Sequence, residues 1–260
     1  MSDATYCYWS VADGYYSQMM KSCIRSARAV GVKEDFHVFS DTNIPGATCH
    51  PAGDFNKACY LFKLTFLKQI AELDYDYFVF LDCDNWFVRH PGNLLNLMKG
   101  SPIHVLFECD CTRESNERGD WWDCPLDEFV RLMTDLGVKS RSIFNVNGGF
   151  WIVKKSAVER VYDLARSFWY YARDEGYEFT EEAPLAYAAH MLIGNPYAHT
   201  LRTNRETWVS DWTGHYDDCL PDGKSWDYVD YLDFSLVRVS PAIVHCMKSK
   251  QAMIHAAQEV

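Results

Sequence analysis

The sequence of 260 residues lacks any run of 18 apolar residues, and it holds only 14 glycines and 9 prolines. Without such a run there is no candidate membrane-spanning helix. With so little glycine and proline, no internal repeat and no biased tract, collagen-like, solenoid and disordered chains are excluded. The first residues also lack the charged and apolar stretches of a secretory signal. We therefore expect a cytoplasmic protein with no integral membrane segment.

Basic residues are scarce as well. The chain has 25 lysines and arginines against 36 acidic residues, which gives a net charge of −11. An acidic surface repels phosphate backbones and anionic lipids, so nucleic acid is not an expected partner. If the ligand is itself an anion, a cation must offset this repulsion, and a bound metal is the usual source of one.

Cysteine is plentiful, with ten residues, but no pattern of disulfides or zinc ligands accompanies it. A chain of this length does not need disulfide bonds to be stable, and without an export signal we expect it to meet reducing conditions. Cys23, Cys59 and Cys83 stand in apolar runs, where cysteine serves as a small core residue. Cys109-Asp110-Cys111 with Cys124 does not have C-x2-C spacing, and no fourth ligand is evident beside the three cysteines. The sequence therefore does not favour zinc there.

Aromatic residues make up 15% of the chain and hydrophobic residues 48%, enough for a large core. The first half alternates between strand and helix patterns, with strands expected at 5–11, 36–39 and 77–81 and helices at 19–30 and 57–72. The continuous apolar run 77–81 suits a strand covered on both faces. This alternation predicts an α/β fold with a mostly parallel central sheet flanked by helices.

The second half is less regular. We predict a strand at 103–107, a polar loop at 108–123, a helix at 126–136 and a strand at 150–153. A capping box, Ser156 to Glu159, predicts a helix that continues to about residue 172. Residues 194–235 give no clear assignment, and the strand pattern at 237–244 is interrupted by Pro241. No linker stands out, so we predict one domain over 1–260.

The strongest chemical signal is Asp82-Cys83-Asp84, which directly follows the most hydrophobic strand. Ligands of open α/β sheets bind at the carboxyl ends of the strands. Two carboxylates that leave a buried strand together repel each other unless a cation neutralises them. Their hard oxygens suit Mn²⁺ or Mg²⁺, which in turn binds a diphosphate. The alternative is an ordinary polar strand end, since aspartate is common in turns.

With this motif in place, the chain resembles the nucleotide-sugar glycosyltransferases of the Rossmann-like GT-A fold, in particular the glycogenin-like and bacterial galactosyltransferase-like group. Four segments carry the resemblance. They are the strand that ends in Ser10-Val11-Ala12-Asp13, the helix at 57–70 with the strand that leads to Asp82 and Asp84, the turn-like 144–150, and Val244-His245-Cys246-Met247-Lys248.

The resemblance implies a metal-dependent, retaining transfer of a sugar from a UDP-sugar to a glycan or other hydroxyl acceptor. Residues 1–100 would form the nucleotide-binding half and 101–260 the donor-sugar and acceptor half. It implies Asp82, Asp84 and His245 as ligands of Mn²⁺ or Mg²⁺, and Glu182 and Asn147 as catalytic residues. The implied nucleotide and donor contacts are Trp9, Ser10, Val11, Asp13, Lys63, Asp82, Cys83, Asn147, Gly148, Gly149, Lys248 and Lys250.

Several alternatives stay open. Gly148-Gly149 suits close approach of a ligand but also an ordinary turn, and Glu182 with Glu181 also suits the positive end of a helix dipole. The family's terminal element has a glycine where Met247 stands, so Lys248 and Lys250 compete for the diphosphate. Loop tryptophans would stack on sugars or pack the irregular half, namely Trp121, Trp122, Trp208, Trp212 and Trp226.

Three other functions compete with the transferase. A strand followed by D-x-D also opens the phosphotransferases of the haloacid dehalogenase type, although those have threonine or valine where Trp86 stands. A non-enzymatic carbohydrate-binding protein would use the aromatic loops alone. A catalytically dead relative of the glycosyltransferases is the last alternative.

Overall fold

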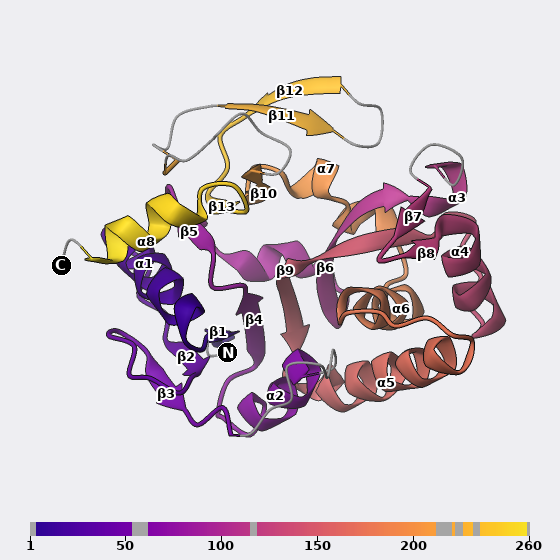
Figure 1. The fold of residues 1–260 in the computed structure, drawn as a ribbon, viewed down its shortest axis with the longest axis horizontal. Coiled ribbons are helices and arrows are strands. Elements are labelled where there is room, and N and C mark those ends of the chain that lie inside the picture. Colours follow the sequence, from indigo (N-terminus) through magenta and orange to yellow (C-terminus); the bar gives the residue numbers. More distant parts are fainter. Residues whose placement is uncertain are drawn as a thin grey trace.

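The computed structural model describes residues 4–53, 62–114, 119–211, 220–221, 226–230 and 235–258. The first half contains β1 (Tyr6–Val11), α1 (Tyr15–Ala29), β2 (Phe36–Phe39), β3 (Thr48–His50), α2 (Phe62–Ile70), β4 (Tyr77–Leu81), β5 (Asn85–Phe87) and the 3-10 helix η1 (Leu94–Met98). The expected alternation is confirmed here (Figure 1), although residues 57–61 of the expected helix lie outside the described residues.

The second half contains β6 (Ile103–Asp110), α3 (Cys111–Glu114), β7 (Asp120–Trp121), β8 (Cys124–Pro125), α4 (Leu126–Asp135), β9 (Phe144–Lys154), η2 (Lys155–Ala157), α5 (Val158–Asp174), α6 (Glu182–Leu192), η3 (Pro196–His199), α7 (Leu201–Asn204), β10 (Trp208–Ser210), β11 (Trp226–Asp230), β12 (Ser235–Val239), β13 (Ile243–His245) and α8 (Lys250–Gln258). Pro241 separates β12 from β13, as its interruption of the pattern indicated. None of the helices in the described ranges has the length and apolar character needed to cross a bilayer.

The central sheet has six strands in the order β3-β2-β1-β4-β9-β6. Strands β3, β2, β1 and β4 pair in parallel, whereas β9 runs antiparallel to both β4 and β6. The prediction of a mostly parallel sheet is therefore confirmed. Strand β2 lies on one side of β1 and β4 lies on the other, so the strand order reverses at β1. Open α/β sheets bind ligands at the carboxyl ends of the strands beside such a reversal.

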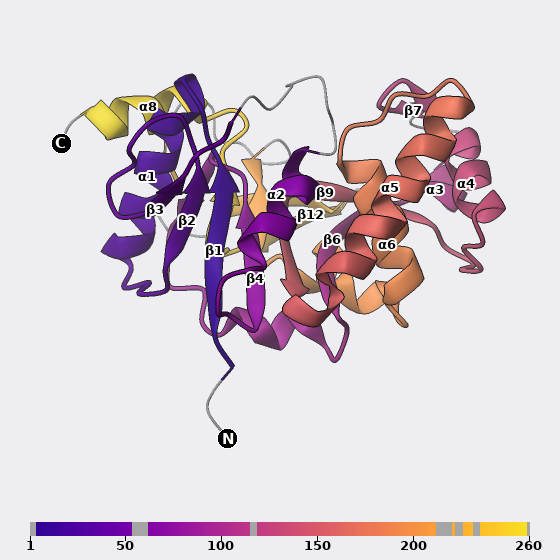
Figure 2. The same cartoon turned by 90° about the horizontal axis from the view of Figure 1, so that it is seen from below.

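Two hydrophobic cores cover the two faces of this sheet. Helices α2, α4, α5 and α6 pack on one face, and α1 and α8 on the other (Figures 1 and 2). Strand β9 alternates between them, since Trp151 belongs to the first core and Phe150 and Ile152 to the second. Cys23 and Cys83 are buried in the second core, as expected, while Cys59 lies outside the described residues.

A smaller sheet of three strands, in the order β10-β13-β5, packs into the second core. It joins residues that are far apart in sequence, because β5 follows the Asp82-Cys83-Asp84 motif and β13 lies near the end of the chain. Strands β11 and β12 form a separate antiparallel hairpin, which lies at the top of Figure 1. The small sheet thus links the D-x-D motif to the C-terminal segment.

The predicted turn around Gly148-Gly149 is wrong, because both glycines lie within β9. Val105 of β6 faces Trp151 and Leu106 faces Asn147, so residues 148–150 form a bulge with no opposite residue in β6. A bulge leaves local backbone groups without ladder partners and aims nearby side chains differently. Here it lies at the edge of the sheet that carries Asp82, whose N–H donates to the Gly149 carbonyl (3.0 Å).

Two further expectations also need correction. The capping box does not form: no side chain caps the start of α5, and Glu159 instead pairs with Lys68 of α2 at 2.9 Å. The expected loop at 108–123 is only partly a loop, because β6 extends to Asp110 and is followed by α3 and β7, with residues 115–118 outside the described ranges. In the second case pairing with β9 continues the strand beyond its predicted end, to Asp110.

Candidate active site

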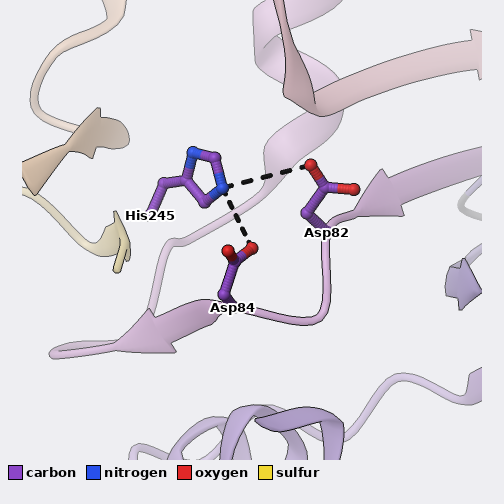
Figure 3. A group of neighbouring side chains, drawn as sticks. All are labelled: Asp82, Asp84 and His245. Carbon is purple, nitrogen blue, oxygen red and sulfur yellow. Dashed lines mark hydrogen bonds and ion pairs between the residues drawn. The ribbon is translucent and has the colours of Figure 1, made fainter. Parts of the chain in front are cut away.

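Asp82, Asp84 and His245 come together at the carboxyl end of β4 (Figure 3). The two aspartates lie between β4 and β5, and β13 pairs antiparallel with β5 so that His245 faces Asn85. The Cys246 N–H also donates to the Asp84 carbonyl (2.7 Å). This pairing brings the imidazole beside two carboxylates more than 160 residues earlier in the chain.

The three side chains are close enough to share one ion. His245 Nε2 lies 2.9 Å from Asp84 Oδ1 and 4.0 Å from Asp82 Oδ2, and one ligand atom from each residue fits within 4.8 Å. Asp84 and His245 are buried, whereas Asp82 is partly open to solvent. Two carboxylate oxygens with one imidazole nitrogen form a mixed set that Mn²⁺ accepts, so these residues fit a divalent metal.

The electrostatics of the cluster favour its charged forms. Burial by itself would raise the pKa of Asp84, but His245 and Lys250 outweigh it and hold the pKa below its ordinary value. Burial likewise opposes protonation of His245, yet the Asp84 and Asp82 carboxylates raise its pKa above the ordinary value. The Asp84 carboxylate is thus ionised at neutral pH.

Two lysines contact the aspartates. Lys63 Nζ of α2 lies 2.9 Å from Asp82 Oδ1 and also contacts Glu181, and Lys250 Nζ of α8 lies 2.9 Å from Asp84 Oδ2. Lys63 also stands over the Phe80 ring, 4.9 Å from its centre. Burial would lower the pKa of Lys63, but Asp82 and Glu181 outweigh it and raise the pKa, so the lysine stays charged.

Of the two candidate diphosphate lysines, Lys250 contacts the cluster through its ammonium group, which lies 2.9 Å from Asp84 Oδ2. Lys248 instead helps to shape the turn after His245, because its backbone N–H donates to Asp211 Oδ1 (2.8 Å). The neighbouring Ser249 binds Asp211 Oδ2 through its N–H (3.0 Å) and its hydroxyl (2.8 Å). This turn leads into α8, whose first residue is Lys250, and it directs Lys250 toward Asp84.

Glu182, at the start of α6, lies on the other side of the β9 bulge. Its Oε1 accepts the Gly148 N–H and its Oε2 accepts the Trp122 indole N–H, both at 2.7 Å. Burial is the main cause that raises the pKa of Glu182 to about 8, with Glu181 and Glu108 adding repulsion. A carboxyl group whose pKa lies near neutrality is suited to acid–base or charge-stabilising chemistry.

Asn147 connects this carboxylate region to β6. Its Nδ2 donates to Glu108 Oε1 (3.0 Å), and its Oδ1 accepts the Gly149 N–H (2.8 Å). The two glycines make room for side chains of the protein rather than only for a ligand. A Cβ on Gly148 would stand 3.0 Å from Glu181 Oε1, and one on Gly149 would stand 3.1 Å from His245 Nδ1.

The predicted nucleotide contacts on β1 differ in their surroundings. Trp9 and Ser10 are fully buried, and Trp9 packs edge-on against Phe80 and Trp151, with ring centres 4.8 and 5.4 Å away. Val11 and Asp13, at the carboxyl end of the strand, are partly exposed. The Cys83 side chain is buried between the two aspartates of the motif. Only Val11 and Asp13 of these five therefore offer side chains to a ligand.

The tryptophans expected in loops also differ in their burial and in the elements that carry them. Trp208 is buried in β10 and donates its indole N–H to Asn85 Oδ1 (2.8 Å). Its placement in a loop is therefore wrong, and of the two alternatives it packs the interior rather than stacking on a sugar. Trp226 begins β11, and Trp212 lies outside the described residues. Trp121 packs against Phe129, with ring centres 4.9 Å apart, whereas Trp122 is 48% exposed. Of Trp121, Trp122 and Trp208, Trp122 is thus the one most open to solvent.

Sequence reasoning missed two residues that organise the site. Glu108 binds Asn147, and nothing in its local sequence distinguishes it from any polar residue near the end of a strand. The buried Asn85 amide donates to the carbonyls of Asp82 (2.9 Å) and Gly149 (3.2 Å), which ties the D-x-D turn to the β9 bulge. A polar residue directly after D-x-D was the only available signal for it.

No protein-family profile and no curated protein sequence matches this chain. Among solved structures it is similar to the bifunctional glycosyltransferase WbbM in its apo form, with a TM-score of 0.60 and 13% identity over 98% of this chain. The match covers 50% of the WbbM chain, so this chain spans about half of that protein. It is also similar to the galactosyltransferase LgtC in complex with donor and acceptor sugar analogues, with a TM-score of 0.57 and 13% identity, covering 97% of this chain and 95% of LgtC.

These similarities give the chain the fold of GT-A glycosyltransferases, as the sequence resemblance predicted. At 13% identity these similarities establish the fold but not the reaction. The Asp-Asp-His cluster stands at the carboxyl edge of the sheet, where this class of fold binds its ligands. The chemistry must therefore be argued from the side chains themselves.

Proposed function

We propose that this chain is a metal-dependent glycosyltransferase that moves a sugar from a UDP-sugar to a hydroxyl of a glycan or other acceptor. The observation that carries the proposal is the cluster of Asp82, Asp84 and His245 with Lys250 and Lys63 around it. The cluster supplies hard ligands for a divalent cation and, in Lys250, an ammonium group for phosphate, in a chain with a glycosyltransferase fold. A protein that only binds carbohydrate would need neither the metal ligands nor an ammonium group for phosphate.

In this proposal Asp82, Asp84 and His245 hold Mn²⁺ or Mg²⁺. The ion supplies Lewis-acid stabilisation of the diphosphate leaving group. Lys250 donates to the diphosphate and offsets the negative charge that develops as the sugar departs. Val11 and Asp13 contact the nucleoside, while Gly149 leaves the space that lets His245 approach β9. The net charge of −11 then tolerates an anionic ligand because positive charge is concentrated at the site.

Glu182 and Asn147 are the proposed catalytic residues. Asn147 is held by Glu108 and Gly149, so its amide has a defined orientation beside the bulge. Glu182 carries a carboxyl group that ionises near pH 8 and is held by two hydrogen bonds. We propose that its ionised form stabilises positive charge on the donor sugar and that the reaction retains the anomeric configuration. The product anomer, observed by NMR, tests retention directly.

The function is tested by UDP release from a panel of UDP-sugars with Mn²⁺, with water or glycans as acceptor. We expect activity that EDTA abolishes and Mn²⁺ restores. Asp82→Asn removes a ligand charge from a partly exposed position, and we expect a loss of at least about a hundredfold. The matched control is Asp163→Asn on the exposed surface of α5, which should keep full activity. Full activity of Asp82→Asn, or of the wild type in EDTA, would refute the proposal.

A further inference from the structure

Each aspartate of the D-x-D motif is already paired with a lysine. Lys63 reaches Asp82 from α2, and Lys250 reaches Asp84 from α8, both at 2.9 Å. His245 adds a third contact, 2.9 Å from Asp84 Oδ1. The groups that would hold a divalent cation are therefore occupied by ammonium and imidazole groups of the protein itself.

The charges of this region nearly balance without any ion. Three carboxylates, Asp82, Asp84 and Glu181, face two ammonium groups, and His245 carries a further charge when it is protonated. Most of these side chains are at least two-thirds buried, so water screens their interactions weakly. A dication that binds alone must displace the two ammonium groups from the aspartates. The positive charges of the lysines and the ion would then lie close together without enough negative charge to balance them, so the dication binds weakly.

The two lysines differ in what they retain once they leave the aspartates. Lys63 also contacts Glu181, so it keeps a carboxylate partner when Asp82 turns to a metal. Lys250 has Asp84 as its carboxylate partner in the described part of the chain, and its ammonium would need another anion. A nucleoside diphosphate that binds with the metal supplies that anion and restores the balance of charge.

We propose that Lys63 and Lys250 act as exchangeable counter-ions, which neutralise Asp82 and Asp84 before loading and make the divalent metal and the nucleoside diphosphate bind cooperatively. Lys250 changes its partner from Asp84 to the diphosphate, and Lys63 keeps Glu181. The inference rests on the proposed function and adds to it a coupling between two ligands. Such coupling is reciprocal, so the diphosphate strengthens metal binding by the same factor as the metal strengthens diphosphate binding.

Calorimetric titration with Mn²⁺, in the absence and presence of UDP, measures this coupling without any turnover. In the wild type we expect UDP to strengthen Mn²⁺ binding by about fivefold or more. Lys250→Met removes the competing ammonium, so Mn²⁺ alone should bind several-fold tighter than in the wild type, and the strengthening by UDP should shrink. A lysine that serves only as a phosphate contact would change UDP binding and leave the affinity for Mn²⁺ alone unchanged or weaker.

The control is Lys68→Met, which removes the same charge from α2 at a partly exposed pair with Glu159 and should change neither constant. Lys63→Met should also tighten binding of Mn²⁺ alone. Because this change leaves Glu181 buried without its lysine partner, the fold of the variant is checked by circular dichroism, and the inference is decided by Lys250→Met. Unchanged or weaker Mn²⁺ binding in Lys250→Met overturns the inference while the proposed function stands. No Mn²⁺ binding by the wild type, with or without UDP, overturns both.

Discussion

At the scale of single residues, the two sides of the site carry opposite electrostatic conditions. Near Asp84 the cations lower the pKa of a buried carboxyl group, whereas near Glu182 burial and two neighbouring carboxylates raise it. A buried carboxyl group is thereby held ionised at Asp84, whereas the carboxyl group of Glu182 titrates near neutrality. Trp122 is part of this division, because its indole N–H is one of the two donors to Glu182.

Replacing Trp122 with phenylalanine tests this arrangement. The indole hydrogen bond favours the ionised form of Glu182 and so lowers its pKa. Without it, the pKa should rise from about 8 by about one further unit. If the ionised form is active, UDP-sugar hydrolysis increases as pH rises through this pKa, and in Trp122→Phe this increase should move to higher pH. Trp169→Phe on α5 is the control, and an unchanged pH profile in Trp122→Phe would contradict the assigned role.

At the scale of elements, strand β9 connects the two sides of the site. Its bulge places Gly148 against Glu181 and Glu182, and Gly149 against His245. The neighbouring β5–β13 pair then sets the position of His245 relative to Asp84. The Asp-Asp-His cluster and the carboxylate of α6 therefore depend on one irregular strand, whose glycines allow side chains from both directions to approach the backbone.

Gly149→Ala should distort the Asp-Asp-His cluster without unfolding the chain. The new Cβ would stand 3.0 Å from Asn147 Oδ1 and 3.1 Å from two atoms of the His245 ring, so the imidazole must move. Because the surroundings of a ligand orient it, we expect Mn²⁺ affinity to fall by about tenfold or more, measured with UDP present. Gly194→Ala is the control, since a Cβ there meets nothing within 4 Å. Equal Mn²⁺ affinity in both variants would show that the bulge does not govern His245.

At the scale of the whole molecule, one sheet separates two hydrophobic cores, and both depend on its central strands. Trp151 packs against both Trp9 and Phe80 in one core, while the adjacent Phe150 and Ile152 fill the other. Helix α8 near the C-terminus packs against α1 near the N-terminus, which ties the two ends of the sequence together. Because loss of β9 would open both cores at once, we expect the two cores to unfold together.

We therefore predict one cooperative thermal transition for residues 1–260, with calorimetric and van't Hoff enthalpies in a ratio of about one. Trp151→Ala should lower the midpoint of this transition without splitting it, at a cost of about 3–5 kcal/mol. Leu236→Ala, at an exposed position of β12, should change stability by less than about 0.5 kcal/mol. Two separated transitions in differential scanning calorimetry would instead indicate two domains.

Local patterns in the sequence were enough for the α/β alternation, the buried strand β4 and the pair of aspartates at its end. Those features follow from hydrophobic periodicity and from the rule that ligands bind at the carboxyl ends of strands. The bulge of β9, the burial of Trp208 and the donor from Trp122 to Glu182 were decided by tertiary structure. Each of them depends on contacts between segments far apart in the chain, whose energies outweigh local preference. The choice of Lys250 over Lys248 as the neighbour of Asp84 has the same origin, because the turn around Asp211 sets the direction of α8.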